Sequence, residues 1–193
     1  NKFFNSPNIT DLIKIIVNKV CSEEIFKTDE KIHLKKYESS MKKINFILVD
    51  GLGSKNIENL DNILTQNQTD EIVSTFPSST SVALGSVNFG SDPIENGLIG
   101  YYHFDKSENR LINTLNWRGS ENYLENKNFY SSQKTIWNTL NEKNIDFNII
   151  QPKDLMNTSL SKHLYRGANQ VGYESLEELH QIFTLPNIID NQF

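Results

Sequence analysis

The chain has 193 residues, of which 37% are hydrophobic and 22% charged, a composition that excludes disordered, collagen-like and fibrous proteins. Asp and Glu outnumber Lys and Arg by 24 to 19, and the net charge of -5 argues against nucleic-acid binding by electrostatics. The single cysteine, Cys21, excludes an internal disulfide and a cysteine-based zinc finger. No apolar run approaches the roughly 20 residues of a membrane span, so we expect no span in this segment.

The first part of the chain predicts a packing helix followed by a solvated connection. Apolar residues recur at helical spacing over residues 9–21, after Pro7 and Asn8. Residues 22–43 carry charges of both signs, which favours a solvated connection over a binding patch. Residues 44–50 form a nearly continuous apolar run, which predicts a central strand buried on both faces of a parallel sheet.

The rest of the chain alternates between predicted helices and predicted strands. Helical spacing and capping residues predict helices at residues 54–65, 82–89, 132–144 and 174–183. Apolar runs bounded by turn residues predict further strands at residues 71–76, 111–117 and 146–150. This alternation indicates an α/β fold with a largely parallel central sheet flanked by helices.

Asp50 is the first candidate for a chemical role, because it ends the predicted strand at residues 44–50. Gly51 and Gly53 follow it and let the backbone turn sharply. Ligands of open α/β sheets bind beyond the carboxyl ends of the strands, where a carboxylate is a hard oxygen ligand for a divalent cation. The alternative is that Asp50 only caps the helix that begins near Ser54.

A hydroxyl-rich turn is the second candidate. Pro77-Ser78-Ser79-Thr80-Ser81 places four hydroxyls between a predicted strand and the start of a helix. Unpaired amides and the helix dipole favour a phosphoryl or sulfuryl group at such a place. A hydroxyl there can attack once a base or a metal activates it, for example an ion held by Asp50. The alternative is a cluster of hydroxyls that only caps the helix.

Several motifs follow one another in an order that is specific in combination. They are Asp50-Gly51-Leu52-Gly53, residues 75–84 (TFPSSTSVAL), residues 92–101 (DPIENGLIGY), residues 111–117 (LINTLNW) and residues 159–168 (SLSKHLYRGA). Together they resemble the type I phosphodiesterase/nucleotide pyrophosphatase branch of the alkaline phosphatase superfamily. The resemblance covers roughly residues 44–182.

The resemblance implies a fold, a cofactor and a mechanism. It implies that residues 1–193 are the N-terminal part of a single alkaline-phosphatase-like catalytic domain. It implies two divalent metal ions, usually zinc, with Asp50 as a ligand of one ion and Thr80 as the metal-bound nucleophile. It also implies a phosphate ester or nucleotide as substrate, and a covalent phospho- or nucleotidyl-threonine that water then hydrolyses.

The chain departs from the family pattern at three places. Asn96-Gly97 stands where the family commonly has His-Gly, and Ser79 and Ala83 stand where the eukaryotic members have Lys and Asn. The substrate contacts of those family residues are therefore not carried over to this chain. The remaining metal ligands of the family come from Asp and His motifs in its second half, which we expect beyond Phe193.

The four histidines do not replace those ligands. His33 lies in the charged connection, His103 follows two tyrosines, and His163 and His180 are expected on exposed helices. Five further residues stay off the catalytic list: Asn116, Arg118 and Arg166, expected in surface or structural roles, and Trp117 and Trp137, expected as core or cleft aromatics.

We therefore expect a metal-dependent hydrolase of phosphoric esters, of the phosphodiesterase or nucleotide pyrophosphatase type, with Thr80 as nucleophile and Asp50 as metal ligand. The 193-residue chain alone is expected to be inactive. One alternative is a phosphomonoesterase, sulfatase or phosphonate hydrolase of the same superfamily. The other is a non-catalytic anion-binding or interaction protein that keeps the fold without the metals.

Overall fold

The structure is a computed structural model that describes residues 6–28, 44–58, 63–66, 70–106, 109–115 and 133–184. The helices are α1 (Ile9–Cys21), α2 (Ser54–Ile57), α3 (Ile63–Gln66), α4 (Thr80–Phe89), α5 (Pro93–Asn96), α8 (Ile136–Glu142), α9 (Ser159–Leu164) and α10 (Leu176–Thr184). The strands are β1 (Tyr102–Asp105), β2 (Arg110–Asn113), β3 (Asn148–Pro152) and β4 (Asn169–Tyr173), and a 3-10 turn, η3, spans Lys153–Leu155. Within these ranges, no helix has the length and apolar character needed to span a membrane.

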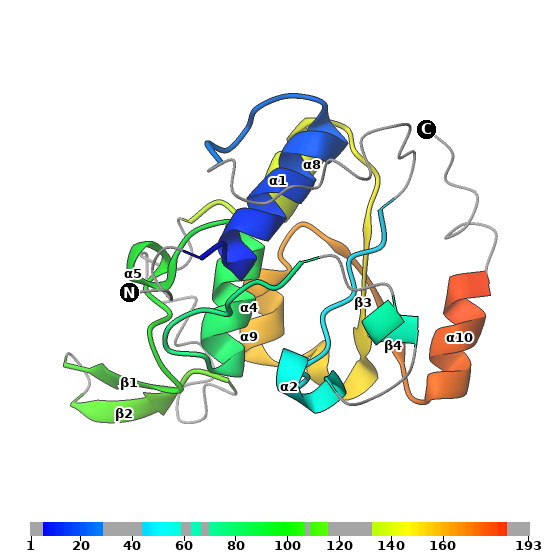
Figure 1. Ribbon diagram of the computed structural model, residues 1–193. Coiled ribbons are helices and arrows are strands. Elements are labelled where there is room, and N and C mark those ends of the chain that lie inside the picture. The colour runs from blue at the N-terminus through cyan, green and yellow to red at the C-terminus, as the bar shows by residue number, and fades with distance from the viewer. Residues whose placement is uncertain are drawn as a thin grey trace.

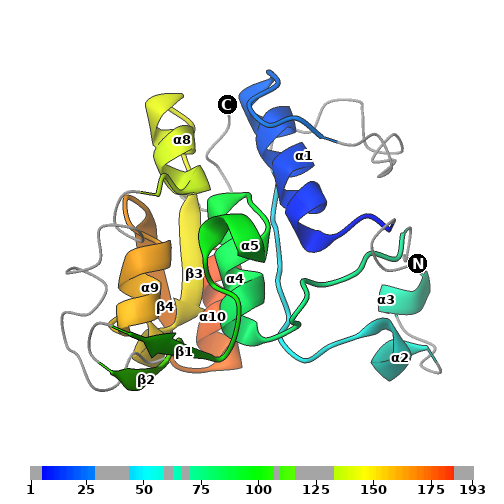
Figure 2. The ribbon, with the colours of Figure 1, turned by 90° about the vertical axis from the view of Figure 1, so that its left-hand side faces the viewer.

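Helix α4 lies in the middle of the described fold (Figures 1 and 2). It packs against α1, α5, α8 and α9, and seven of its ten residues are buried. Close packing depends on small residues, because a Cβ atom on Gly85 would come within 2.7 Å of Leu98. The helix ends at Gly90, whose φ of 60° lies in the left-handed region that glycine adopts easily. The helix predicted at residues 82–89 is thereby confirmed.

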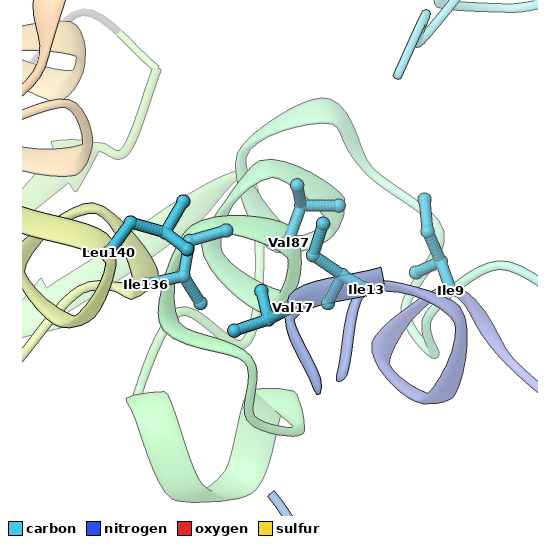
Figure 3. Packing of buried hydrophobic residues seen from close by; sticks show 6 residues of the cluster. All are labelled: Ile9, Ile13, Val17, Val87, Ile136 and Leu140. Carbon is cyan, nitrogen blue, oxygen red and sulfur yellow. The ribbon is translucent and has the colours of Figure 1, made fainter. Parts of the chain in front are cut away.

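Two hydrophobic clusters meet at α4. The first joins α4 to α1 and α8 and consists of Ile9, Ile13, Val17, Val87, Ile136 and Leu140 (Figure 3). The second joins α4 to the β1–β2 hairpin and α9 and consists of Phe89, Leu98, Ile112, Leu160 and Leu164. Because α4 contributes a side chain to each cluster, burial of apolar surface holds the helix from more than one direction.

Helix α1 has the bounds that the sequence predicts. Asn8 caps it, since the Asn8 Oδ1 atom accepts hydrogen bonds from the amides of Thr10 and Asp11. The Asp11 carboxylate accepts a bond from the Asn8 amide in return, which completes a capping box. Ser22 ends the helix in the left-handed region. The apolar face of α1 then packs on α4, as the helical spacing of the sequence indicates.

The strands form two small sheets. Strands β3 and β4 are parallel, with Ile150 opposite Val171, and β1 and β2 form an antiparallel hairpin with His103 opposite Ile112. The expected α/β content is therefore present. The large parallel central sheet is not formed by the residues that the structure describes, in which only β3 and β4 pair in parallel.

Two predicted strands are wrong for this structure. Residues 44–50 are irregular, and Ile47 is 70% exposed, although the sequence predicts a buried central strand there. Residues 71–76 make only an isolated parallel bridge, between Val73 and Asn8. An apolar run becomes a buried strand only where neighbouring strands satisfy its backbone groups and cover its faces. No described strand pairs with residues 44–50.

The other predicted elements are present with shifted ends. The predicted strands at residues 111–117 and 146–150 correspond to β2 and β3. The predicted helices at residues 132–144 and 174–183 correspond to α8 and α10. Helix α8 begins late because Thr135 caps it, with Thr135 Oγ1 accepting a hydrogen bond from the Asn138 amide. The helix predicted at residues 54–65 is found as α2 and α3, and the residues between Glu58 and Ile63 lie outside the described ranges.

Candidate active site

The fold brings together Asp50 and Thr80, the two residues that the sequence singles out. The Thr80 Oγ1 hydroxyl donates a hydrogen bond to Asp50 Oδ2 over 3.1 Å, although the two residues are 30 positions apart. Asp50 is exposed on a turn that continues through Gly51, whose φ of 70° favours glycine. Thr80 is the first residue of α4. A carboxylate and a hydroxyl thus meet where a buried helix begins.

Asp50 does not cap the helix that follows it. The residue at the cap of α2 is Gly53, whose amide donates a hydrogen bond to Asn56 Oδ1 over 2.8 Å. Ser54, the first residue of α2, donates its hydroxyl to Glu71 Oε1 over 2.9 Å. The capping alternative for Asp50 is therefore wrong, and its carboxylate faces Thr80 instead.

The start of α4 lacks a side-chain cap. Ser79 occupies the capping position in extended conformation, but its side chain accepts no hydrogen bond from the helix. The Ser79 Oγ atom is buried, and among the described residues it has no hydrogen-bond partner. The amides of the first helical turn are thus not capped by Ser79, and together with the helix dipole they favour an anion. The alternative that the hydroxyls of residues 78–81 only cap the helix therefore does not hold for Ser79, which makes no capping hydrogen bond.

The donor set fits part of a divalent metal site. Asp50 Oδ2 and Thr80 Oγ1 are hard oxygen donors 3.1 Å apart, a spacing suited to two ligands of one ion bound at about 2 Å. A complete site needs at least about four ligands. The described part of the chain contains no group of three or more His, Cys, Asp or Glu side chains that could hold an ion. His33 lies outside the described residues.

A comparison with known protein families finds a match over the segment that contains both residues. The family model described as type I phosphodiesterase / nucleotide pyrophosphatase matches residues 46–174, which include Asp50 and Thr80. The chain belongs to this family. No curated protein and no solved structure gives a match. Membership relates the protein to hydrolases of the phosphodiesterase and nucleotide pyrophosphatase type, which are generally metal-dependent.

Asn96, one of the departures from the family pattern, is an internal packing residue of this family member. It is 0% exposed, and its Oδ1 atom accepts a hydrogen bond from the Leu98 amide over 2.9 Å. Its Nδ2 atom donates to the Ser91 carbonyl over 3.0 Å and faces Ser86 of α4. Asn96 therefore holds the segment after α5 against α4 and does not face the candidate site as a ligand.

The prediction that His163 lies on an exposed helix is wrong, because the residue is buried. Helix α9 packs on α4, so that His163 is 8% exposed and its ring lies 5.8 Å from the Phe89 ring, centroid to centroid. The Arg166 Nη1 atom contacts the imidazole and donates to the His163 carbonyl over 3.2 Å. Burial, and secondarily the positive charge of Arg166, lower the pKa of His163 from 6.5 to about 4.

Arg166 and Trp137 have the structural roles that the sequence indicates. The half-buried guanidinium of Arg166, which follows α9, lies 5.9 Å from the centroid of the Phe89 ring. Trp137 stacks on Phe147, and its Nε1 atom donates to Asn88 Oδ1 over 2.5 Å. His180 is exposed on α10, as expected. Asn116, Trp117 and Arg118 lie outside the described residues.

The low pKa of His163 predicts a pH dependence of stability. The unfolded chain binds a proton at the ordinary pKa of 6.5, whereas the folded protein resists it until about pH 4. The free energy of unfolding therefore falls as the pH is lowered from 6.5 to 4, by about 1.4 kcal/mol per pH unit from this residue, and is independent of it at higher pH. Urea unfolding at several pH values measures this slope.

The matched variants are His163→Gln and His180→Gln. His163→Gln removes the titrating group and is expected to flatten the slope relative to the unchanged protein, whatever its constant effect on stability. His180→Gln removes an exposed histidine and is expected to leave the slope as it was. An unaltered slope in His163→Gln contradicts the assignment of a buried neutral imidazole.

Proposed function

We propose that this protein hydrolyses phosphoric esters, as a phosphodiesterase or nucleotide pyrophosphatase, with Thr80 as the nucleophile. The observation that carries the proposal is the hydrogen bond from Thr80 Oγ1 to Asp50 Oδ2 at the start of α4. The family match over both residues supports the same class of reaction. The proposal assigns residues 1–193 to the N-terminal part of a single alkaline-phosphatase-like catalytic domain built on a largely parallel sheet.

The residues of the site divide the work of phosphoryl transfer. Asp50 Oδ2 accepts a hydrogen bond from the Thr80 hydroxyl and so fixes the direction in which that hydroxyl points. Thr80 Oγ1 loses its proton and forms a bond to phosphorus, the bond from phosphorus to the leaving oxygen breaks, and the departing oxygen takes up the proton that Thr80 released. Water then attacks the same phosphorus, breaks the Thr80 Oγ1 bond and restores the hydroxyl. The uncapped amides of the α4 first turn face the negative oxygens of the transferred group.

Asp50 and Thr80 are also the residues that would hold a metal ion. Their oxygens supply two hard donors. The described residues contain no group of three or more His, Cys, Asp or Glu side chains that could hold an ion, so the proposal takes the further ligands from other parts of the complete protein. The cofactor proposed is a pair of divalent ions, zinc by resemblance to the family. A bound divalent ion supplies Lewis-acid stabilisation of the phosphoryl oxygens and favours the ionised form of the Thr80 hydroxyl.

Removing the nucleophile tests the catalytic role of Thr80. In the complete protein with zinc supplied, Thr80→Ala is expected to lower turnover of bis(4-nitrophenyl) phosphate by about 10³-fold or more while leaving the urea unfolding curve intact. Thr80→Ser keeps a hydroxyl and is expected to retain measurable turnover. The control is Ser78→Ala, which removes an exposed hydroxyl two residues earlier and is expected to change nothing.

Retained hydrolysis in Thr80→Ala contradicts the proposed role of that residue. The same assay with a phosphate monoester, a sulfate ester and a phosphonate separates the related hydrolases, and the proposal predicts the highest kcat/KM on the diester. A protein that turns over none of these substrates, and whose biological role survives Thr80→Ala, is the non-catalytic anion-binding alternative.

Metal content tests the role of Asp50. Asp50→Asn replaces a charged oxygen ligand by a neutral amide, and the complete protein is expected to lose roughly one metal ion per chain after dialysis, as measured by elemental analysis. Asp146→Asn is the matched control, because Asp146 is an exposed aspartate before β3. Equal metal content in all three proteins contradicts the proposal that Asp50 is a ligand.

A further inference from the structure

Two buried hydroxyls join the first turn of α4 to the base of the β1–β2 hairpin. Ser81, the residue after Thr80, is 0% exposed, and Thr114, just after β2, is 2% exposed. Their Oγ and Oγ1 atoms lie 2.8 Å apart. Thr114 Oγ1 also lies 2.7 Å from the Gly100 carbonyl and 2.9 Å from that of Tyr101. We name this pair of hydroxyls, Ser81 and Thr114, the hydroxyl clasp.

The clasp satisfies its own hydrogen-bond requirements. Each hydroxyl has one proton to donate. In one arrangement Thr114 Oγ1 donates to the Gly100 or the Tyr101 carbonyl and accepts from Ser81 Oγ. In the other, Ser81 Oγ donates to the Gly100 carbonyl over 3.3 Å and accepts from Thr114 Oγ1. Both protons have an acceptor in either arrangement. The Thr114 amide donates to the Tyr101 carbonyl over 2.9 Å, which fixes the base of the hairpin beside the clasp. Two apolar side chains of equal volume would fill the same space, but they would form no hydrogen bonds and so would not fix the hairpin relative to the helix.

The clasp includes the residue that follows the proposed nucleophile in the first turn of α4. Thr80 contacts Asp50, whereas the next residue, Ser81, contacts the hairpin, so the first turn of α4 is held by two different segments. Figures 1 and 2 show the hairpin at the end of α4 where the helix begins, and α1 and α8 toward its other end. The close approach of Leu98 to Gly85 fixes the same connecting segment farther along the helix.

We propose that Ser81 and Thr114 are positioning residues that orient the Thr80 hydroxyl toward Asp50 and the substrate phosphorus. This inference rests on the proposed function, since it concerns the orientation of the Thr80 hydroxyl as nucleophile. A small displacement of a reacting atom lowers the rate steeply, by up to about 10²-fold for an error on the order of 1 Å. The clasp holds the turn without touching the substrate, so its loss changes kcat more than KM.

The experiment compares Ser81→Ala, Thr114→Val and Thr114→Ser in the complete protein, with bis(4-nitrophenyl) phosphate as substrate. Ser81→Ala and Thr114→Val are expected to lower kcat by about tenfold with KM within about twofold of the unchanged protein. The double variant is expected to be no worse than either single variant, because both break the same contact. Thr114→Ser keeps the hydroxyl and is expected to restore kcat to within about threefold.

The matched control is Thr139→Val, which removes a buried hydroxyl of α8 that donates to the Thr135 carbonyl within the same helix end. It is expected to leave kcat unchanged even where it lowers stability. Equal kcat in Thr114→Val and the unchanged protein overturns the proposal. A loss in Thr114→Ser as large as that in Thr114→Val also overturns it, because the hydroxyl would then not be the group that matters.

A second measurement separates this inference from the proposed function. The Ala83 amide donates to the Ser79 carbonyl over 2.9 Å, so its hydrogen exchange reports on the first turn of α4. Exchange at Ala83 is expected to be about tenfold faster in Thr114→Val than in Thr139→Val. If the unchanged protein hydrolyses no ester, the proposed function fails, and unaltered exchange at Ala83 in Thr114→Val overturns the clasp by itself.

Discussion

Burial of α4 is the constraint on which the rest of the described structure depends. The helix contributes to both hydrophobic clusters and packs against four other helices, so its position is set by the body of the fold. Two residues fix the segment after α5 against α4. Gly85 has no side chain and lets Leu98 approach the helix, and Asn96 faces Ser86 of the helix and donates to the Ser91 carbonyl just after it. Thr80 is thereby carried on a rigid element, which a nucleophile requires for a precise attack.

The start of α4 combines rigidity with unsatisfied polar groups. Ser79 does not cap the helix, and the Asp50 carboxylate accepts a hydrogen bond from the Thr80 hydroxyl. Leaving helix amides uncapped costs stability, and such costs are common where a protein binds a ligand. Polar side chains farther from this point have hydrogen-bond partners: Asn96 Oδ1 accepts from the Leu98 amide, and Trp137 Nε1 donates to Asn88 Oδ1.

Local signals in the sequence predicted the elements whose stability is local. The Asn8 cap and apolar spacing give α1 its bounds, and the turn before Thr80 and the glycine at position 90 give those of α4. The strand predicted at residues 44–50 is not formed, because a strand requires pairing partners that an apolar run does not specify. The burial of His163 and the Ser81–Thr114 contact depend on segments distant in the chain, and no spacing pattern encodes such contacts. Asp50 was singled out because it ends an apolar run before two glycines, and the turn at residues 77–81 because of its hydroxyls. Thr80 was chosen within that turn because the motifs resemble a family.

The most direct test of this account is to trap the group transferred to the enzyme. The complete protein with zinc is mixed with bis(4-nitrophenyl) phosphate, quenched with acid during turnover, digested and mapped by mass spectrometry. We predict an organophosphoryl or phosphoryl group on Thr80, reduced in Asp50→Asn and absent in Thr80→Ala. Steady turnover with the adduct on another residue, or with no adduct at any time after mixing, contradicts it.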